Sequence, residues 1–285
     1  MSYVSVAYKL FGGVGRSIRG SFLDVRDNLH KASIAYTIEE YISMALFTVM
    51  LTFVLETIML SFIFGLIIEP IAAVMLASTL AATLSGALFF FFYTYPGTLV
   101  KHRRGQIRKV LPFASSYLAT IASSKISPLL MFKTLSGFKE YGYIAKESEQ
   151  IVKGVEIFGM NVSTAIKKEA KRTPSKEFAE LLWGINSMLT SGGDLADFLR
   201  DKSESFMSDY RRRIRKYSQD LSLYVEIYLT LIITGSIFFI VLSSVISTLA
   251  GGASTILIQS FIVFLLLPML SIGFIVLIKS SSPLE

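Results

Sequence analysis

The residues of this chain that could carry out chemistry are few, and their spacing does not favour catalysis. The sequence contains no cysteine and only two histidines, His30 and His102, each close to basic residues. Disulfides and thiolate chemistry are therefore excluded, and two isolated histidines lack the spacing of a metal site. The run Gly12-Gly13-Val14-Gly15 is not followed by the Lys-Ser/Thr of a phosphate-binding loop, and no other nucleotide, hydrolase or zinc-protease motif occurs. We expect no enzyme activity, no metal and no cofactor.

Two carboxylates, Glu56 and Glu226, fall inside long apolar runs. An ionised carboxylate at membrane depth is costly, so such a residue usually faces a protein interior. One interpretation is a polar contact to another subunit or to a translocated helix. The other is a locally satisfied packing residue. For Glu226 the two interpretations are equally good, whereas the central position of Glu56 favours an intramembrane functional contact.

The elements that must position these residues are membrane helices. Four runs are long and apolar enough to cross a bilayer, which needs roughly 20 residues: Ile42–Ile68, Ile71–Tyr93, Leu221–Leu249 and Thr255–Ile278. The remaining segments show helical periodicity and no convincing strand. The sequence therefore predicts an all-α polytopic membrane protein, with four transmembrane helices arranged as two hairpins that flank a cytoplasmic helical bundle.

The distribution of basic residues predicts the orientation of this protein. The segment Lys101 to Asp220 holds 22 of the 28 Lys and Arg but 13 of the 21 Asp and Glu, whereas the turns at Glu69-Pro70 and Ala250 to Ser254 hold no Lys or Arg. Basic loops remain on the cytoplasmic side of a membrane. We therefore expect a multi-pass protein of the cytoplasmic (inner) membrane with both termini in the cytoplasm. This bias also accounts for the basic pI without a nucleic-acid partner.

These features divide the chain into five segments. Residues 1–36 form an amphipathic cytoplasmic segment, 37–99 the first transmembrane hairpin, 100–220 the cytoplasmic bundle, 221–280 the second hairpin and 281–285 a tail. In the first segment one helical stripe is apolar, and we expect this helix to lie on the membrane surface or to pack against the bundle. Its members are Ile18, Phe22, Val25, Leu29 and Ala32.

Capping signals predict where the helices begin and end. Thr37 and Glu40 form a capping box at the start of the first span, and Pro96 is expected to end the second span after an aromatic belt. Ser127-Pro128 and Thr173-Pro174 each place a capping hydroxyl before a proline at the first helical position. Gly192 and Gly193 are expected to end one helix, and Asp194, with Asp197 three residues on, to cap the next. That last helix is expected to continue into the third span.

A run of cations lies just before the third span: Arg211, Arg212, Arg213, Arg215 and Lys216. Such a run sets topology and contacts anionic lipid headgroups. It also suits the docking of an acidic cytoplasmic partner, and the two roles are compatible.

Several short motifs, in order, resemble those of a known family. They are Leu111-Pro112-Phe113, Gly159 with Ala165-Ile166, and Ser191-Gly192-Gly193-Asp194-Leu195. This segment resembles the F-domain of type II secretion and type IV pilus platform proteins. Leu223 to Tyr228, followed by Gly235 and Phe238-Phe239, is similar to the archaeal branch, which serves archaella and adhesive pili. The single unit resembles the short paralogues of tight-adherence pili.

The resemblance implies a mechanism and a set of partners. A cytoplasmic assembly ATPase docks beneath such a platform, and pilin or archaellin subunits pass from the bilayer into the filament base. Because many archaeal platform proteins contain two such units, a single unit implies pairing with itself or with a paralogous platform subunit. The rival hypothesis is a small four-helix membrane transporter or channel subunit. The sequence does not identify which filament is assembled.

Overall fold

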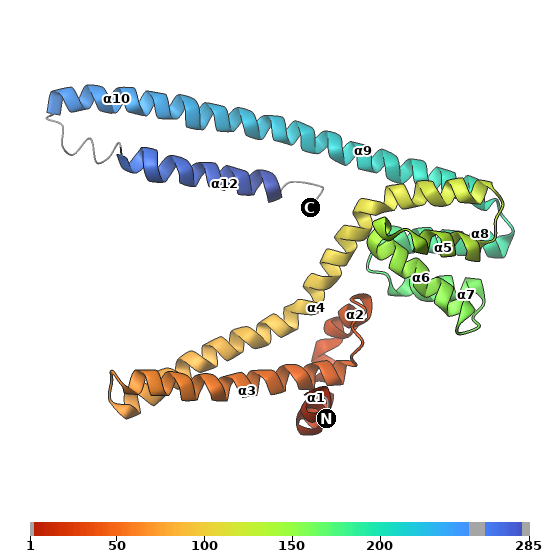
Figure 1. Cartoon of the computed structure of the whole chain (residues 1–285), viewed down its shortest axis with the longest axis horizontal. Helices are drawn as coiled ribbons and strands as arrows, with labels where there is room; N and C mark the ends of the chain where they lie inside the picture. The colour runs from red at the N-terminus through yellow and green to blue at the C-terminus, as the bar shows by residue number, and fades with distance from the viewer. Residues whose placement is uncertain (1–2, 251–259, 281–285) are drawn as a thin grey trace. The chain divides into compact units, whose positions relative to one another are not determined.

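The structure, a computed structural model, describes residues 3–250 and 260–280, and these residues contain helices and no strand. The chain divides into two compact units, Met1–Leu199 and Arg200–Glu285. Figure 1 labels the helices in chain order. The expected all-α class is confirmed for the described residues.

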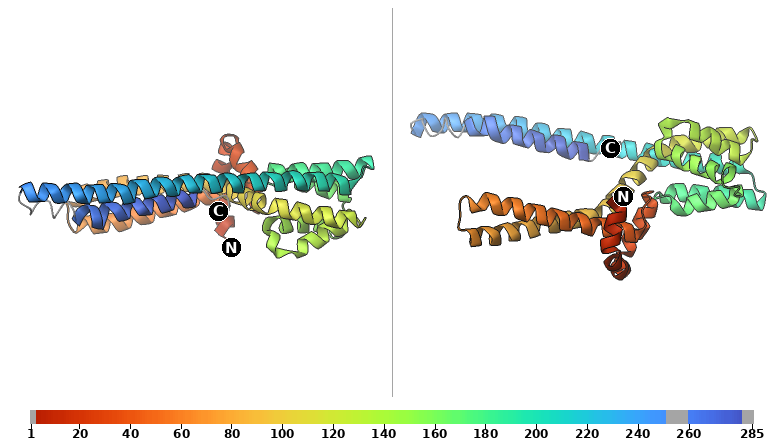
Figure 2. Two further views of the ribbon diagram at one scale, coloured as in Figure 1. Left: turned by 90° about the horizontal axis from the view of Figure 1, so that it is seen from above. Right: turned by 60° about the horizontal axis from the view of Figure 1, so that its bottom comes forward.

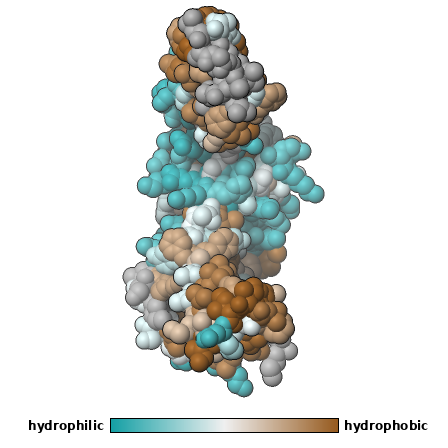
Figure 3. Space-filling view, turned by 90° about the vertical axis from the view of Figure 1, so that its left-hand side faces the viewer, coloured by the Kyte–Doolittle hydropathy of each residue, from teal (hydrophilic) through white to brown (hydrophobic). Residues whose placement is uncertain are grey.

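The first unit contains a long helical hairpin formed by α3 (Ile38–Gly65) and α4 (Pro70–Ser123). The predicted capping box at its start is confirmed, since Thr37 Oγ1 accepts from Glu40 N and Glu40 Oε2 accepts from Thr37 N at 2.8 Å. Every fourth residue of α4 on one side is small and buried, which allows close approach to α3: Ala73, Ala77, Ala81 and Ser85. The remaining apolar side chains at the far end of the hairpin are exposed, as the lower part of Figure 3 shows.

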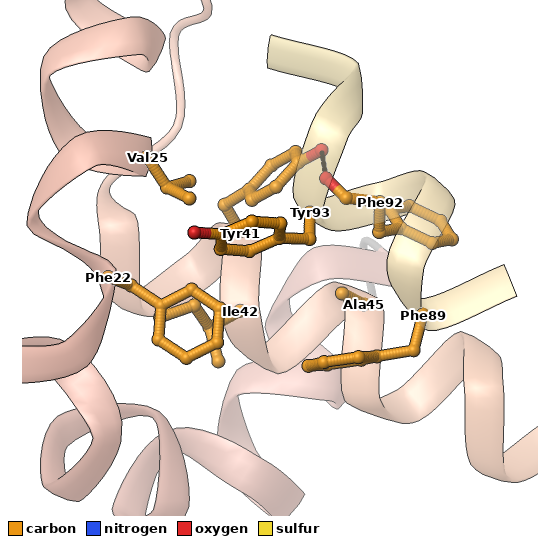
Figure 4. Close-up of a pocket in the computed structure, with 8 residues that line it drawn as sticks. All are labelled: Phe22, Val25, Tyr41, Ile42, Ala45, Phe89, Phe92 and Tyr93. Carbon is orange, nitrogen blue, oxygen red and sulfur yellow. Dashed lines mark hydrogen bonds between the residues drawn. The ribbon is translucent and has the colours of Figure 1, made fainter. Parts of the chain in front are cut away.

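Helix α4 does not end at Pro96, so the predicted helix stop is wrong. The helix includes both Pro96 and Pro112 and continues to Ser123. Proline lacks the N–H that would bond to the carbonyl four residues earlier, which for Pro96 is that of Phe92. The hydroxyl of Tyr41 on α3 donates to this Phe92 oxygen at 2.8 Å (Figure 4). A hydrogen bond from the neighbouring helix therefore replaces the missing one, and the helix can continue.

The N-terminal segment forms two helices rather than one: α1 (Tyr3–Ile18), a short 3-10 turn η1 (Arg19–Phe22), and α2 (Leu23–Lys31). Helix α1 packs on α3, and α2 packs on α4 and α3. Val25 and Leu29 of the predicted stripe are buried in a cluster with Tyr41 and Ile42 of α3. The apolar stripe around α2 thus packs on the first hairpin and not on the bundle, which was the packing partner predicted from the sequence.

The helical bundle follows α4 and is built from short helices that pack on their neighbours in the chain. They are α5 (Pro128–Gly137), the 3-10 turn η2 (Lys139–Tyr141), α6 (Gly142–Glu156), α7 (Val162–Arg172) and α8 (Lys176–Ser191). Its fully buried side chains include Ile107, Leu118, Phe132, Ile144, Ile166, Phe178 and Ile185. Figure 2 shows these helices from two further directions.

The caps of the bundle agree with the prediction at one of the two hydroxyl–proline pairs. Ser127 caps α5 with Pro128 in the first turn, as predicted. The cap of α8 is Ser175 rather than Thr173, because Thr173 instead ends α7 and Ser175 Oγ accepts from Phe178 N at 3.2 Å. The prediction for Thr173 is therefore wrong by two residues.

A long helix, α9 (Leu195–Tyr228), begins at the end of the first unit and supplies the start of the second. It continues through a π-helical segment η3 (Leu229–Thr234) into α10 (Gly235–Ala250), so the predicted continuity into the third span is confirmed. The second π-helical segment η4 (Ile262–Leu266) leads into α12 (Leu267–Ser280). The turn predicted at Ala250 to Ser254 lies, except for Ala250, outside the described residues.

Within residues 3–250 and 260–280, four helices are long and apolar enough to cross a membrane, as predicted. They are Ile38–Gly65, Pro70–Ser123, Leu195–Ile246 and Val263–Ser280. The second and third spans are each the apolar part of a longer helix that also contributes charged residues. The division at residues 99 and 220 therefore falls inside continuous helices, and as a division into domains it remains a prediction.

Candidate functional site

The first unit contains a buried cluster of charged side chains where the N-terminal segment meets the bundle. Arg103 comes from α4, Glu147 from α6, and Glu169 with Arg172 from the end of α7. Arg103, Glu147 and Glu169 are each no more than 5% exposed. Long charged side chains are almost never buried to this extent unless they are paired. We call these four residues the junction cluster.

Arg103 joins three parts of the first unit through its guanidinium group. Its Nη1 donates to the Lys31 carbonyl and to Ser33 Oγ, both at 2.7 Å. Its Nη2 donates to Glu147 Oε1 at 3.3 Å, and the guanidinium lies 4.9 Å from the centre of the Tyr143 ring. The planar fork of arginine suits several partners at once. Arg103 therefore links the residues after α2 to α4 and α6.

Ser33 is held in an unusual conformation at this junction. Its φ angle is 55°, in the left-handed region that non-glycine residues rarely adopt. Its hydroxyl accepts from Arg103 and also from Arg172 Nη2 at 3.1 Å. Such backbone strain persists only where the surroundings over-determine the conformation. Two arginines from two different helices hold this residue in place.

The two carboxylates of the junction cluster hold their protons more tightly than ordinary glutamates. Burial raises the pKa of Glu147 to about 7, and the neighbouring Glu169 acts in the same direction, against the Thr173 hydroxyl and the charges of Arg103 and Arg172. Burial also raises the pKa of Glu169. One oxygen of each carboxylate and Arg103 Nε are buried without a hydrogen-bond partner among the described residues. Because the pKa of Glu147 is about 7, the gain or loss of one proton near neutral pH changes the net charge of the cluster.

An open pocket of about 350 Å³ adjoins the junction cluster and is lined in part by Ser33, Arg103, Tyr143, Glu147 and Arg172. These groups can hold charge, accept a proton and fix the loop after α2. Covalent acyl or phosphoryl transfer needs a nucleophile that is paired with a base, and none of these lining residues forms such a pair. The arrangement suits a structural connection.

Sequence reasoning missed this cluster, although the sequence contains a signal for it. Glu147 lies between Ile144 and Ile151, which are three and four residues away and share one face of α6. Glu169 similarly follows Ile166 by three residues. A carboxylate on the apolar face of a helix must be buried with a partner. The partners come from distant segments, so the sequence indicates that a charge is buried but not what pairs with it.

The predicted turn after α8 forms as expected. Gly192 is left-handed with φ of 73°, and Gly193 N donates to the Met188 carbonyl at 3.1 Å. Asp194 Oδ1 accepts from Ala196 N at 2.8 Å and from Asp197 N at 3.1 Å, which caps α9. This turn fixes the point from which α9 departs, more than 20 residues in sequence from the junction cluster.

The predicted intramembrane carboxylates lie in different surroundings. Glu56 is half-buried in the α3–α4 hairpin, and its Oε2 accepts from Ser85 Oγ at 3.4 Å. Glu226 is exposed on α9. The contact to Ser85 is the local pairing considered above as one interpretation of Glu56, and a contact to another subunit remains a prediction for both residues.

The basic run lies on α9, in the second unit. Arg211, Arg212, Arg215 and Lys216 are exposed, and Arg213 is half-buried. Arg212 pairs with Asp209 one turn earlier. The two histidines line separate pockets, and the glycines of residues 12–15 belong to helix α1 and not to a loop.

Comparison with known proteins gives a partial match. Residues 114–243 match the family described as "Type II secretion system (T2SS), protein F". A "Flagella accessory protein J" of Methanocaldococcus jannaschii is 29% identical over 150 residues, which are 52% of this chain and 26% of that protein. An uncharacterized protein of the same organism is 25% identical over 134 residues, 47% of this chain and 22% of its own length. The matched segments thus span about a quarter of these relatives. No solved structure gives a significant match.

Proposed function

Because residues 114–243 match the type II secretion system protein F family, we propose that this chain is a membrane platform protein of a filament assembly machine. The machine is of the type IV pilus or archaellum kind, in keeping with the similarity to a flagella accessory protein of an archaeon. The platform couples a cytoplasmic assembly ATPase to the insertion of pilin or archaellin subunits at the filament base. It has no chemistry of its own.

The observation that carries this proposal is the uninterrupted helix from the bundle into the third span. The 34 residues of α9 extend for about 50 Å at 1.5 Å per residue, and the helix then continues through η3 into α10. The family match itself runs from α4 through the bundle and α9 into α10. A helix without a break transmits displacement from its cytoplasmic end to its membrane end. In this proposal α9 is the connecting element.

The basic run on α9 is the proposed contact for the ATPase. Its exposed cations suit an acidic protein surface, and their position before the membrane also suits lipid headgroups. The chain lies in the cytoplasmic membrane with both termini in the cytoplasm. The bundle is then on the side where the ATPase is found.

The length of the relatives supports a paired platform. The match to the flagella accessory protein covers 52% of this chain but 26% of that protein, so that relative is about twice as long. A second copy of this chain, or a paralogous platform subunit, would supply the other half. Glu56 and Glu226 are proposed as polar contacts to that subunit or to a pilin helix within the membrane.

A binding measurement on the full chain tests the proposal. The chain in lipid nanodiscs is titrated with a secretion-type assembly ATPase of the same organism, and a deletion strain is examined for filaments by electron microscopy. Binding and loss of filaments are expected. No association, together with normal filaments in the deletion strain, would refute the platform function. Ion or solute flux into proteoliposomes would support the transporter hypothesis instead.

Charge-reversal variants test the docking surface separately. Arg211→Glu with Arg215→Glu is expected to weaken ATPase binding. Lys139→Glu with Lys167→Glu changes the net charge equally at exposed positions of the bundle and serves as the matched control. Equal effects of both pairs would mean that only the total charge matters.

A further inference from the structure

Helix α1 packs on α3 through a face of small residues. Ala7 is fully buried, and Gly15 is buried as well. A side chain at Gly15 would meet Ser43 Oγ at 3.1 Å and the Glu39 carbonyl at 3.2 Å, so the backbones approach closely there. Figures 1 and 2 show that α1 runs across the N-terminal end of α3 rather than along it.

The contacts of Tyr3 show which side of α1 faces the apolar length of α3. The Tyr3 ring lies 5.4 Å from that of Phe47, and its hydroxyl is 2.7 Å from Thr48 Oγ1. Thr48 is nine residues beyond Glu39, which is about 13 Å further along the helix. Glu39 is in the first turn of α3, at the polar end of the span. Tyr3 therefore points from the end of α3 toward its membrane-embedded part.

Two other apolar residues share the side of α1 that carries Tyr3. Leu10 and Val14 follow Tyr3 by seven and eleven residues, which is about two and three helical turns. Leu10 is 63% exposed, Tyr3 46% and Val14 45%. We call these three residues the apolar edge. The apolar edge faces the same direction as Tyr3, toward the membrane-embedded part of α3.

The opposite edge of α1 is polar. Ser5, Lys9 and Arg16 are exposed and lie about half a turn away from the apolar edge. The helix contains two basic residues and no acidic residue. An exposed apolar edge, a basic polar edge and a third side fixed to a membrane helix are the features of a helix in the plane of a membrane surface.

We propose that α1 is an in-plane membrane helix whose apolar edge is inserted in the lipid of the leaflet where α3 begins. Lys9 and Arg16 then lie among headgroups and water. The lipid bilayer, rather than a protein, covers Tyr3, Leu10 and Val14. Continuity with the apolar surface of the α3–α4 hairpin supports lipid as the occupant, since α1 is docked on a helix that is long and apolar enough to cross the membrane. The proposal does not depend on the platform function.

The absence of native cysteine allows a direct test on the full chain. Single variants Leu10→Cys and Val14→Cys carry a spin label in proteoliposomes, and Lys9→Cys and Ser5→Cys are the matched controls on the polar edge. The collision rates of each label with oxygen, which concentrates in lipid, and with a water-soluble nickel chelate are compared. Labels at 10 and 14 are expected to shift toward oxygen and those at 5 and 9 toward nickel.

Two results would overturn the proposal. If the labels at 10 and 14 were as accessible to nickel as those at 5 and 9, the edge would face water. If they were shielded from both reagents, a protein surface such as a second copy would cover the edge. A melting temperature equal to that of the cysteine-free chain shows that each labelled variant remains folded. Because ATPase binding is not part of the readout, failure here leaves the platform proposal intact.

Discussion

The hydrogen bond from Tyr41 to Phe92 is expected to stabilise the chain more strongly because residue 96 is proline. Pro96 lacks the N–H that would bond to the Phe92 carbonyl, and the Tyr41 hydroxyl donates to that oxygen at 2.8 Å. Tyr41→Phe removes the hydroxyl and leaves the ring, which packs at 6.3 Å from that of Phe92. The perturbation is therefore confined to one donor.

The expected loss of stability on Tyr41→Phe follows from the surroundings of the Phe92 carbonyl oxygen. Tyr41 is 5% exposed and Phe92 is half-buried, so water does not readily replace the lost donor. A buried acceptor left unsatisfied costs about 1–3 kcal/mol, more than the net worth of an average hydrogen bond. In a Pro96→Ala background the alanine N–H can bond to the Phe92 carbonyl. We expect Tyr41→Phe to cost about 0.5–1 kcal/mol there, the net value for a bond whose acceptor keeps a partner.

A double-mutant cycle measures this coupling directly. The four proteins, Tyr41→Phe, Pro96→Ala, the double variant and the unmodified chain, are unfolded in the same detergent while helicity is monitored. A coupling of about 1–2 kcal/mol is expected, within the range seen for residues in contact. Tyr95→Phe, at an exposed tyrosine one position before Pro96, is the control and is expected to change little. Equal costs of Tyr41→Phe in both backgrounds would refute the reasoning.

Three further predictions concern the bundle and its junction. Because folding raises the pKa of Glu147 to about 7, the contribution of this carboxyl to stability is full below the ordinary pKa of 4.5 and is lost as the pH rises through 7. The melting temperature of Glu147→Gln should therefore fall less over this pH range than that of Glu149→Gln, an exposed control, and parallel curves of the two variants would contradict the raised pKa. Ser33→Ala should destabilise the chain by about 1 kcal/mol more than Ser33→Gly, since both variants lose the hydroxyl that accepts from Arg103 and Arg172, but only glycine adopts the left-handed backbone conformation without strain. If Ser33→Gly were the less stable variant in denaturant unfolding, strain at this position would be excluded. Gly184→Ala should cost about 1–3 kcal/mol because its new methyl group would overlap the Phe198 ring, whereas a methyl group at the control Gly137→Ala meets nothing within 4 Å. Equal stabilities of the two variants would show that the Phe198 ring moves aside freely.

The sequence was sufficient for features that depend on neighbouring residues. The capping box at Thr37 and Glu40, the Gly192 turn and the Asp194 cap each involve residues within five positions of one another. The long apolar spans were predictable for the same reason, since bilayer thickness alone sets their length. Local chemistry decides these features before any tertiary packing forms.

The sequence was insufficient where a distant group changes a local rule. Pro96 is a helix breaker unless another helix supplies a donor, and that donor is 55 residues away at Tyr41. The misplaced cap at Thr173 is a local error instead, since its backbone N–H donates to the Glu169 carbonyl four residues earlier and ends α7. The junction cluster likewise depends on pairing between segments 44 or more residues apart.

The junction cluster is better understood as a device for specificity than as a source of stability. Removing charged groups from water costs several kcal/mol per ion, and an ion pair offsets this only with near-complete hydrogen bonding. Among the described residues, one oxygen of each carboxylate and Arg103 Nε lack a hydrogen-bond partner, so the offset is incomplete, although Arg172 Nε lies 3.7 Å from Glu169 Oε1. An apolar cluster of the same volume would stabilise the bundle at least as well, but it would not recognise the Lys31 carbonyl and the Ser33 hydroxyl. The charges therefore select one position for the N-terminal segment. In the proposed platform this gives the bundle a second connection to the first hairpin beside the continuous helix α4, through the residues after α2 and the start of α3.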